Sequence, residues 1–445
     1  MDRVLPALAA AALLATLAPS PTTASGISGL ESDEIEMSFS LLTSEFYKKV
    51  DQQAALDGAR IQLADFLEHA GVKNAKITAL RAVEDPTSNA KSLEREVSAI
   101  STAYGSRVGG SRQLTYEAIT GMMSSVKDKY TTFLTPRQYA DLNEGLDGGN
   151  FSGVGISIQV DEKSKLLTVN EVIPGGPAEK AGLQPGDTIT LIDGKSTKGL
   201  TTDQDAKLLR GEKGTIVKLT IVRDNAELPV IAVTRDTIHQ PSVYSKLLDG
   251  GIGYARLTVF GQNTADELSS ALSRLQAQGA KAYVLDLRDN GGGYLNAAID
   301  VSSKFIQSGP IVSVESRGGS DTQYDAENTA IPPKPLAVLV NKYTASASEI
   351  TSGAIQDDGV GALIGEKTYG KGVVQTIHPL PDGSAVKITS ARYLTPRGRD
   401  INLVGIQPDI VTIEPKTAKL GDPLTDAQLQ SAVTYLQGKI AQAGT

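Results

Sequence analysis

The sequence contains no cysteine, no tryptophan and only three histidines among its 445 residues. The lack of cysteine excludes disulfides, thiol catalysis and a lipidated N-terminal cysteine. The three histidines, His69, His239 and His378, do not lie in a recognisable nucleophile or metal motif. We therefore expect no metal or organic cofactor, and a serine nucleophile in this chain would need a base other than histidine.

The sequence also has no excess of positive charge and few long hydrophobic runs. The net charge of −8 disfavours a nucleic-acid-binding surface. The apolar run from Val4 to Ala18 is too short to span a bilayer comfortably and is followed by small residues up to Ala24. This pattern predicts a secretory signal peptide over residues 1–24. We expect export to the periplasm or cell envelope, with no membrane span in the mature chain.

The stretch from residue 336 to residue 375 carries the strongest chemical pattern. An apolar run over 336–340 predicts a buried strand, and a helical pattern that includes Ile350 follows a run of small residues. A serine in this turn would lie at a helix N-terminus, where free N–H groups favour developing negative charge. Lys371 lies between two glycines, and a desolvated lysine can be neutral and act as a base. The plainer interpretations are a serine that caps the helix and a lysine in a solvated loop.

Two motifs in this stretch resemble the carboxyl-terminal processing proteases, also called tail-specific proteases. They are Ser-Ala-Ser-Glu-Ile over 346–350 and Tyr-Gly-Lys-Gly over 369–372, and the resemblance extends over most of residues 128–436. Members of that family are serine endopeptidases with a Ser/Lys dyad. The resemblance implies that Ser346 is the nucleophile, that Lys371 is the base and that Gln375 orients the lysine.

A glycine-rich segment after another predicted strand resembles a second motif of that family. The segment is Asp-Leu-Arg-Asp-Asn-Gly-Gly-Gly over 286–293, and Gly291 stands where the family has proline. Glycine lets the main chain approach a substrate closely. The resemblance implies that the N–H groups of Gly292 and Ala347 form an oxyanion hole. By itself, such a glycine triplet is also typical of an ordinary loop.

Residues 151–235 resemble a PDZ domain, a module that binds protein C-termini. The segment Gly153-Val154-Gly155-Ile156 matches its carboxylate-binding loop, because consecutive N–H groups beside small residues can bind an anion. The strand that follows would offer its edge to a peptide tail. An ordinary hairpin is the plainer interpretation of the glycines.

A helix expected near residues 203–210 should line the peptide groove of this domain. Leu208 and Leu209 are the candidate apolar contacts, and Arg210 is a candidate sensor that would reach the active site and report tail binding. A surface salt bridge is the alternative role for Arg210.

The order of the patterns predicts a chain of mixed α/β (α+β) class. We expect a helical N-terminal region over 25–147, a PDZ domain over 148–235, a mixed-sheet protease core covered by helices over 236–415, and a C-terminal helical segment over 416–445. In the core, Thr264 and Glu267 predict a capping box at the start of a helix. Asp422 to Leu436 predicts the final helix.

The sequence thus predicts an exported serine endopeptidase that recognises protein C-terminal tails and cleaves peptide bonds. Its expected partners are proteins with free, apolar C-termini, and a homo-oligomer is compatible with the N-terminal helices. One alternative is a PDZ adaptor that binds tails but has only a relic protease core. A second is a nucleotide-binding loop from Gly365 to Lys371, although Gly372 stands where a Ser or Thr should bind magnesium.

Overall fold

The computed structural model describes residues 26–146, 151–161, 164–173, 175–238, 241–319, 321–415 and 418–443. The predicted signal peptide and His239 lie outside the described residues. The chain folds into two compact units. The first holds the described residues up to Ser44, Lys49–Phe133 and His378–Asp382, and the second holds Glu45–Lys48, Leu134–Ile377 and the described residues of Gly383–Thr445.

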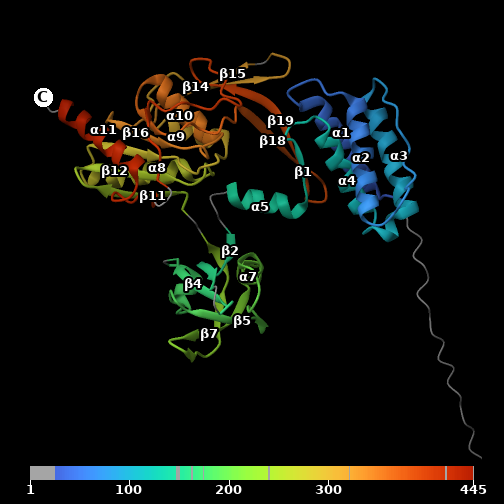
Figure 1. Cartoon of the computed structure of the whole chain (residues 1–445), viewed down its shortest axis with the longest axis horizontal. Coiled ribbons are helices and arrows are strands. Elements are labelled where there is room, and N and C mark those ends of the chain that lie inside the picture. The colour runs from blue at the N-terminus through green and yellow to red at the C-terminus, as the bar shows by residue number, and fades with distance from the viewer. Residues whose placement is uncertain are drawn as a thin grey trace, which may run out of the picture. The chain divides into compact units, whose positions relative to one another are not determined.

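The first unit is helical, as the sequence predicts for this part of the chain (Figure 1). Asp51 and Asp85 cap two of its helices with their carboxylates, which accept hydrogen bonds from free N–H groups of the first turn. Two helices cross closely at Gly58 and Gly121, since a Cβ on either glycine would lie within 2.4 Å of the carbonyl oxygen of the other. The elements are α1 (Gly29–Glu45), α2 (Gln52–His69), α3 (Pro86–Tyr104), the 3-10 helix η1 (Gly105–Arg107) and α4 (Ser111–Ser124).

A small antiparallel sheet forms the core of the predicted PDZ domain. Its strand order is β3-β4-β5-β7-β8, with β6 on β5 and β9 on β7, and β2 pairs separately with β10. Its buried side chains form one apolar cluster. The elements are β2 (Phe151–Gly153), β3 (Ile156–Val160), β4 (Leu167–Val172), α6 (Pro177–Lys180), β5 (Thr188–Ile192), β6 (Lys195–Ser196), α7 (Thr202–Leu209), β7 (Ile216–Arg223), β8 (Ala226–Glu227), β9 (Ile231–Thr234) and β10 (Asp236–Ile238).

A mixed sheet, in the order β11-β12-β13-β16-β17-β20, lies in the region of the predicted protease core, so the predicted fold class is confirmed. The first pair is antiparallel and the rest are parallel. The strands β13 and β16 are buried along their whole length, as expected for strands covered on both faces. The strands are β11 (Val243–Leu248), β12 (Ile252–Leu257), β13 (Ala282–Asp286), β16 (Leu336–Val340), β17 (Ala362–Gly365) and β20 (Ile410–Val411).

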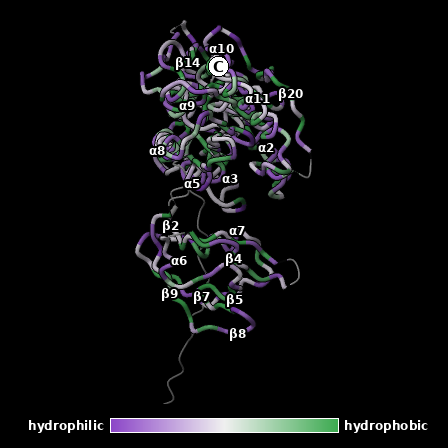
Figure 2. The backbone as a smooth tube through the Cα atoms, turned by 90° about the vertical axis from the view of Figure 1, so that its left-hand side faces the viewer, coloured by the Kyte–Doolittle hydropathy of each residue, from purple (hydrophilic) through white to green (hydrophobic). Residues whose placement is uncertain are grey.

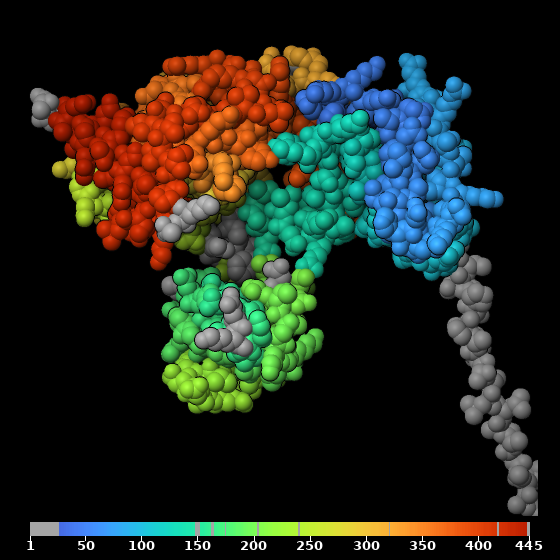
Figure 3. Space-filling view, in the orientation of Figure 1, coloured from blue at the N-terminus to red at the C-terminus, as the bar shows by residue number. Residues whose placement is uncertain are grey.

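Helices cover both faces of this sheet. Leu257 points to the face covered by α8 (Thr264–Ala277), α9 (Leu295–Ser302) and α10 (Ala347–Asp358). Tyr254 points to the opposite face, which α11 (Ala427–Ala443) covers with apolar side chains. Figure 3 shows the red C-terminal atoms packed on the orange core. Because the strands from β12 onward are parallel, their carboxyl ends meet at one edge, where loops gather to form sites.

A second, smaller sheet lies beside the loops that follow β17. Its central strand, β19 (Ala385–Leu394), pairs with β14 (Pro310–Ser316) and with β18 (Val373–Pro379), and β14 also pairs with β15 (Asp321–Asp325). The strand β18 begins two residues after Lys371. Along the chain, a short strand, β1 (Thr132–Leu134), and α5 (Pro136–Leu146) connect the first unit to the PDZ domain.

Three sequence-based expectations about local structure are wrong. Thr264 is the first residue of α8 rather than its cap, and the Glu267 carboxylate accepts hydrogen bonds from Ser242 instead of closing a capping box. The final helix begins at Ala427, not at Asp422. The loop after β17 leads into the strand β18, whereas a phosphate-binding loop must lead into a helix, so the nucleotide-binding alternative fails.

Hydrophobic and hydrophilic residues alternate along the chain in Figure 2. None of the helices within the described ranges is both long enough and apolar enough to cross a membrane.

Candidate active site

Ser346 lies in a strained turn between a buried strand and a helix. The strand β16 ends at Val340, α10 begins at Ala347, and Ser346 has φ 58° and ψ −119°. A residue with a side chain rarely adopts this conformation, which costs about 1–3 kcal/mol and persists where the surroundings enforce it. A strained strand-turn-helix of this kind exposes a nucleophilic side chain at the start of a helix.

Ser348, the neighbouring serine of the motif, has a different role. Its side chain is fully buried, and its Oγ donates a hydrogen bond to the Asn290 carbonyl at 3.0 Å. The Ser346 side chain, in contrast, is only partly buried. The structure therefore favours Ser346 over Ser348 as the serine that a substrate can reach.

A single buried carboxylate connects the serine turn to the lysine loop. The Glu349 side chain is inaccessible to solvent, and its Oε2 accepts hydrogen bonds from the N–H groups of Ser346 at 3.0 Å and Lys371 at 2.8 Å. Its Oε1 accepts from the Thr368 hydroxyl at 2.6 Å and the Gly370 N–H at 2.7 Å. The main chains of Ser346 and Lys371 thus meet through one oxygen atom, although 25 positions separate them in sequence.

The main chain packs closely around Lys371, as the two flanking glycines predict. A Cβ on Gly370 would lie 2.8 Å from the nitrogen of Gly405, and one on Gly372 would lie 2.7 Å from the nitrogen of Asn402. The lysine itself is partly buried. Larger side chains at 370 or 372 would displace this loop.

Gln375 lies on β18, four residues beyond the lysine. Its amide nitrogen donates a hydrogen bond to the carbonyl of Val373, on the same strand, at 3.2 Å. Its expected role in orienting Lys371 stays a prediction.

The loop of Gly292 lies directly against the serine turn. Gly292 has φ 100°, and a Cβ there would lie 2.8 Å from Ala345 O, Ala347 N and Ser346 Cβ. Ala347 is the first residue of α10, so its N–H has no helical carbonyl four residues before it. The Gly292 N–H donates to Asn290 Oδ1 at 2.9 Å. To act as the second donor of an oxyanion hole, this N–H must also donate to the substrate oxyanion, or must give up its hydrogen bond to Asn290.

Asn290 holds the two loops of this site together. Its side chain is fully buried and donates to the carbonyl of Leu257 at 2.9 Å, while its own carbonyl accepts from the N–H of Ala345 at 3.0 Å. The contacts of Asn290 could not be predicted from the sequence, because they join segments that follow three different strands.

A buried charge cluster lies at the start of the same loop. The Arg288 side chain is fully buried between Asp286 at 2.6 Å and Asp426 at 2.7 Å, and the Asp286 carboxylate also accepts from the Tyr254 hydroxyl at 2.7 Å. Burial alone would lower the pKa of Arg288, but its hydrogen bonds to both carboxylates raise this pKa overall. The cluster fastens the segment before α11 to the start of the glycine-rich loop.

The predicted carboxylate-binding loop is held by hydrogen bonds from residues outside it. Gly153 ends β2, and the carbonyls of Val154 and Gly155 accept hydrogen bonds from Ala178 at 2.8 Å and Ile173 at 3.0 Å. Ile156 opens β3, which is the end strand of its sheet among the described strands and so offers a free edge. This arrangement is suited to the addition of a peptide strand.

The helix α7 packs beside β3. Leu208 is partly buried, whereas Leu209 is 4% exposed and belongs to the apolar core of the domain. Leu208 is therefore the better candidate for contact with a tail. Arg210 forms an ion pair with Glu144 on α5 at 3.0 Å, which is the alternative role that the sequence left open for it.

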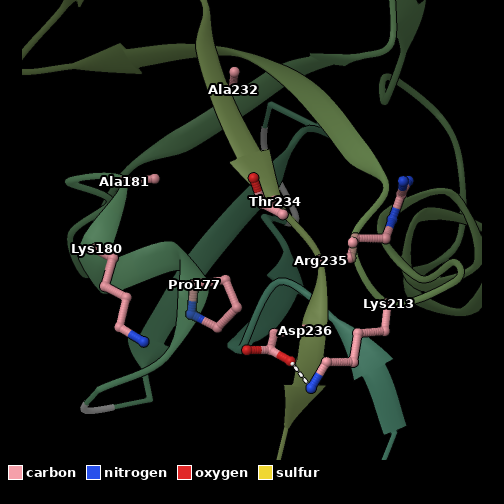
Figure 4. A pocket seen from close by; sticks show the side chains of 9 residues that line it. Pro177, Lys180, Ala181, Lys213, Ala232, Thr234, Arg235 and Asp236 are labelled. Carbon is pink, nitrogen blue, oxygen red and sulfur yellow. Dashed lines mark ion pairs between the residues drawn. The ribbon is translucent and has the colours of Figure 1, made fainter.

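A separate pocket of about 450 Å³ lies on the PDZ domain (Figure 4). Lys213 and Asp236 face each other across it in an ion pair at 2.7 Å, and Pro177 and Lys180 of α6 form another side. None of the predicted peptide-binding residues lines this pocket.

Comparison with known proteins identifies both parts of the second unit. The model of peptidase family S41 matches residues 251–412, and a PDZ-domain model matches residues 168–223. A carboxyl-terminal-processing protease of Picosynechococcus sp. is 41% identical over 330 residues, which are 73% of this chain and 80% of that relative. The chain belongs to this family of carboxyl-terminal processing proteases. It is therefore a serine peptidase with a PDZ domain, and peptides or proteins are its substrates.

Other known proteins are also similar to this protease. The carboxy-terminal processing protease CtpA of Bacillus subtilis is 41% identical over 326 residues, 73% of this chain and 69% of that relative. A solved structure titled photosystem II D1 C-terminal processing protease is 30% identical, with a TM-score of 0.48, and the match covers 91% of this chain and 97% of that one.

Proposed function

We propose that this protease is an exported serine endopeptidase in which Ser346 and Lys371 form the catalytic dyad. The observation that carries the proposal is the Glu349 carboxylate, which binds the N–H groups of both residues with one oxygen. The strained conformation of Ser346 supports it further, because such strain concentrates at reacting residues.

The reaction requires the lysine amine to be neutral when the substrate binds. Lys371 takes the proton of Ser346 Oγ as that oxygen attacks the carbonyl carbon of the scissile bond, which gives a tetrahedral oxyanion. The resulting ammonium donates the proton to the leaving amine, and the acyl-enzyme forms. Lys371 then takes a proton from a water molecule that attacks the ester carbonyl and returns this proton to Ser346 Oγ as the ester C–O bond breaks, and the second product leaves with a free carboxylate.

Backbone donors would stabilise the oxyanion. The N–H of Ala347 lies at the positive end of α10, and Gly292 brings a second N–H beside it. One such donor contributes about 3 kcal/mol to transition-state stabilisation. Gln375 would complete the site by holding the lysine amine.

The PDZ domain would select the substrate through its C-terminus. In this proposal, the free carboxylate binds at residues 153–156, the peptide pairs with the edge of β3, and an apolar side chain of the tail contacts Leu208. Residues 1–24 would direct export and then be removed. The mature chain would consist of a helical N-terminal region over 25–147, the PDZ domain over 148–235, the protease core over 236–415 and a C-terminal helical segment over 416–445. Arg210 would report tail binding to the core, and the N-terminal helices would allow self-association.

Replacement of either dyad residue tests the function. We expect Ser346→Ala and Lys371→Ala to lower kcat for a peptide with an apolar C-terminus at least 10³-fold, since each removes a partner in proton transfer. Ser348→Ala is the matched control, because it removes a serine hydroxyl two residues further along the chain.

A binding measurement on the same variants separates the enzyme from the adaptor alternative. Both dyad variants should bind the tail peptide with wild-type affinity, as measured by fluorescence anisotropy. Normal cleavage by Lys371→Ala would refute the dyad. Absence of cleavage by the wild-type chain, with tail binding intact, would favour a PDZ adaptor.

A further inference from the structure

Tyr393 reaches from the smaller sheet to both proposed catalytic residues. It lies near the end of β19, where its N–H donates to the Gly372 carbonyl at 3.0 Å and its other edge pairs with Val314 of β14. The side chain is 1% exposed and packs in the main apolar cluster of the core. Because two strands and a packed core hold the ring, its hydroxyl can occupy only one position.

That hydroxyl contacts the main chains of both halves of the dyad. It donates a hydrogen bond to the carbonyl of Lys371, and the carbonyl oxygen of Ser346 lies 3.2 Å from the same oxygen. The Ser346 carbonyl also accepts from the N–H groups of Glu349 at 2.7 Å and Ile350 at 2.9 Å, so α10 holds it independently. The Lys371 carbonyl therefore depends more on the Tyr393 hydroxyl than the Ser346 carbonyl does.

We propose that Tyr393 is a positioning residue, which fixes the main chain of Lys371 beside the carbonyl of Ser346 so that the lysine amine reaches the serine hydroxyl. This inference rests on the proposed Ser/Lys dyad. Glu349 fixes the N–H groups of the two residues, and Tyr393 fixes the carbonyl of Lys371, so the peptide units on both sides of the lysine are held. Tyr393 acts through Lys371, because its own hydroxyl is bonded to the main chain and buried.

Removal of a single oxygen atom tests the inference. In Tyr393→Phe the ring remains packed, but the Lys371 carbonyl loses its donor and the loop gains freedom. We expect kcat to fall at least tenfold with KM changed less than twofold, since substrate binding does not involve this contact. The rate at which a fluorophosphonate probe labels Ser346 should fall by a similar factor.

Tyr283→Phe is the matched control. Tyr283 is likewise buried, at 2% exposure, and packs in the same apolar cluster, but it lies on β13 and its hydroxyl has no hydrogen-bond partner among the described residues. This variant should keep kcat within twofold of wild type, and thermal unfolding followed by circular dichroism should show that both Phe variants are folded. A para-aminophenylalanine at 393, which keeps an N–H donor, should recover most of the lost kcat.

Two results would overturn the inference. One is wild-type kcat and labelling rate in Tyr393→Phe; the other is a Phe variant that does not fold, because the hydroxyl would then serve the fold as a whole. Ser346→Ala and Lys371→Ala, assayed in parallel, distinguish this failure from that of the dyad. If both are inactive while Tyr393→Phe is normal, the dyad stands and only the role of Tyr393 is refuted.

Discussion

Replacing Glu349 by glutamine perturbs the one carboxylate that joins the serine turn to the lysine loop. The glutamine side chain has nearly the same volume, so it fits the buried site, but only one of its two terminal atoms can accept a hydrogen bond. Whichever way the amide is turned, its NH₂ group faces two donors. In the native structure each carboxylate oxygen accepts two hydrogen bonds at 2.6–3.0 Å.

The size of the effect follows from these contacts. A hydrogen bond to a charged group contributes about 1.5–3 kcal/mol to stability, so the loss of two amounts to at least about 3 kcal/mol in the free energy of unfolding. If the loop of Lys371 moves by about 1 Å in response, catalysis should fall by about 10²-fold. We therefore expect Glu349→Gln to lower kcat/KM about 10²-fold and to lower the urea midpoint of the core.

The assay combines cleavage of a tailed peptide with urea unfolding followed by fluorescence of the tyrosines. Glu366→Gln is the control, because it makes the same change in the same loop on a residue that is only partly buried. This control should keep both its kcat/KM and its urea midpoint near those of the wild type. A Glu349→Gln variant with wild-type kcat/KM and an unchanged urea midpoint would contradict the argument that this carboxylate organises the site.

Three further substitutions follow from the contacts. Gly292→Ala should lower kcat at least 10²-fold in the same cleavage assay, because its Cβ would lie 2.8 Å from three atoms of the serine turn, whereas Gly291→Ala, with nothing within 4 Å, should be tolerated. Gly121→Ala should lower the thermal midpoint of the helical unit, since its Cβ would meet a carbonyl oxygen at 2.3 Å; an unchanged midpoint would refute this close helix crossing. Burial raises the pKa of Asp426, but hydrogen bonds from Arg288 lower it overall, so its stabilisation is present above the unfolded pKa of about 3.9 and is lost as pH falls through the lower folded value. The difference in unfolding free energy between wild type and Asp426→Asn should therefore shrink as pH falls from 7 to 3, and a constant difference would contradict this.

Much of the local structure could be predicted from the sequence. The apolar run 336–340 is the strand β16, because period and length suffice to define a buried strand. The start of α8 could not be predicted in the same way. Glu267 has the spacing of a capping box, but Ser242, 25 positions earlier, offers its carboxylate better-placed donors in the folded core.

The candidate site, too, could be predicted only in part from the sequence. The motifs around Ser346 and Lys371 predicted a candidate nucleophile and base, because both motifs resemble those of a known family and can be recognised in the sequence. The assignment of the peptide groove was less complete, because only the folded domain shows that Leu209 packs inward and Leu208 does not.

The sequence alone thus determined the family, the order of the domains and the identity of the candidate nucleophile and base, because these depend on residue types at fixed spacings. Only the tertiary structure decided how the reacting residues are held: by the Glu349 carboxylate, the Asn290 amide and the Tyr393 hydroxyl. Each of these groups satisfies polar atoms from segments far apart in the chain, and a buried polar group takes whichever partner the fold brings to it. The partners of a buried polar group depend on how strands and helices pack, and local sequence patterns do not predict this packing.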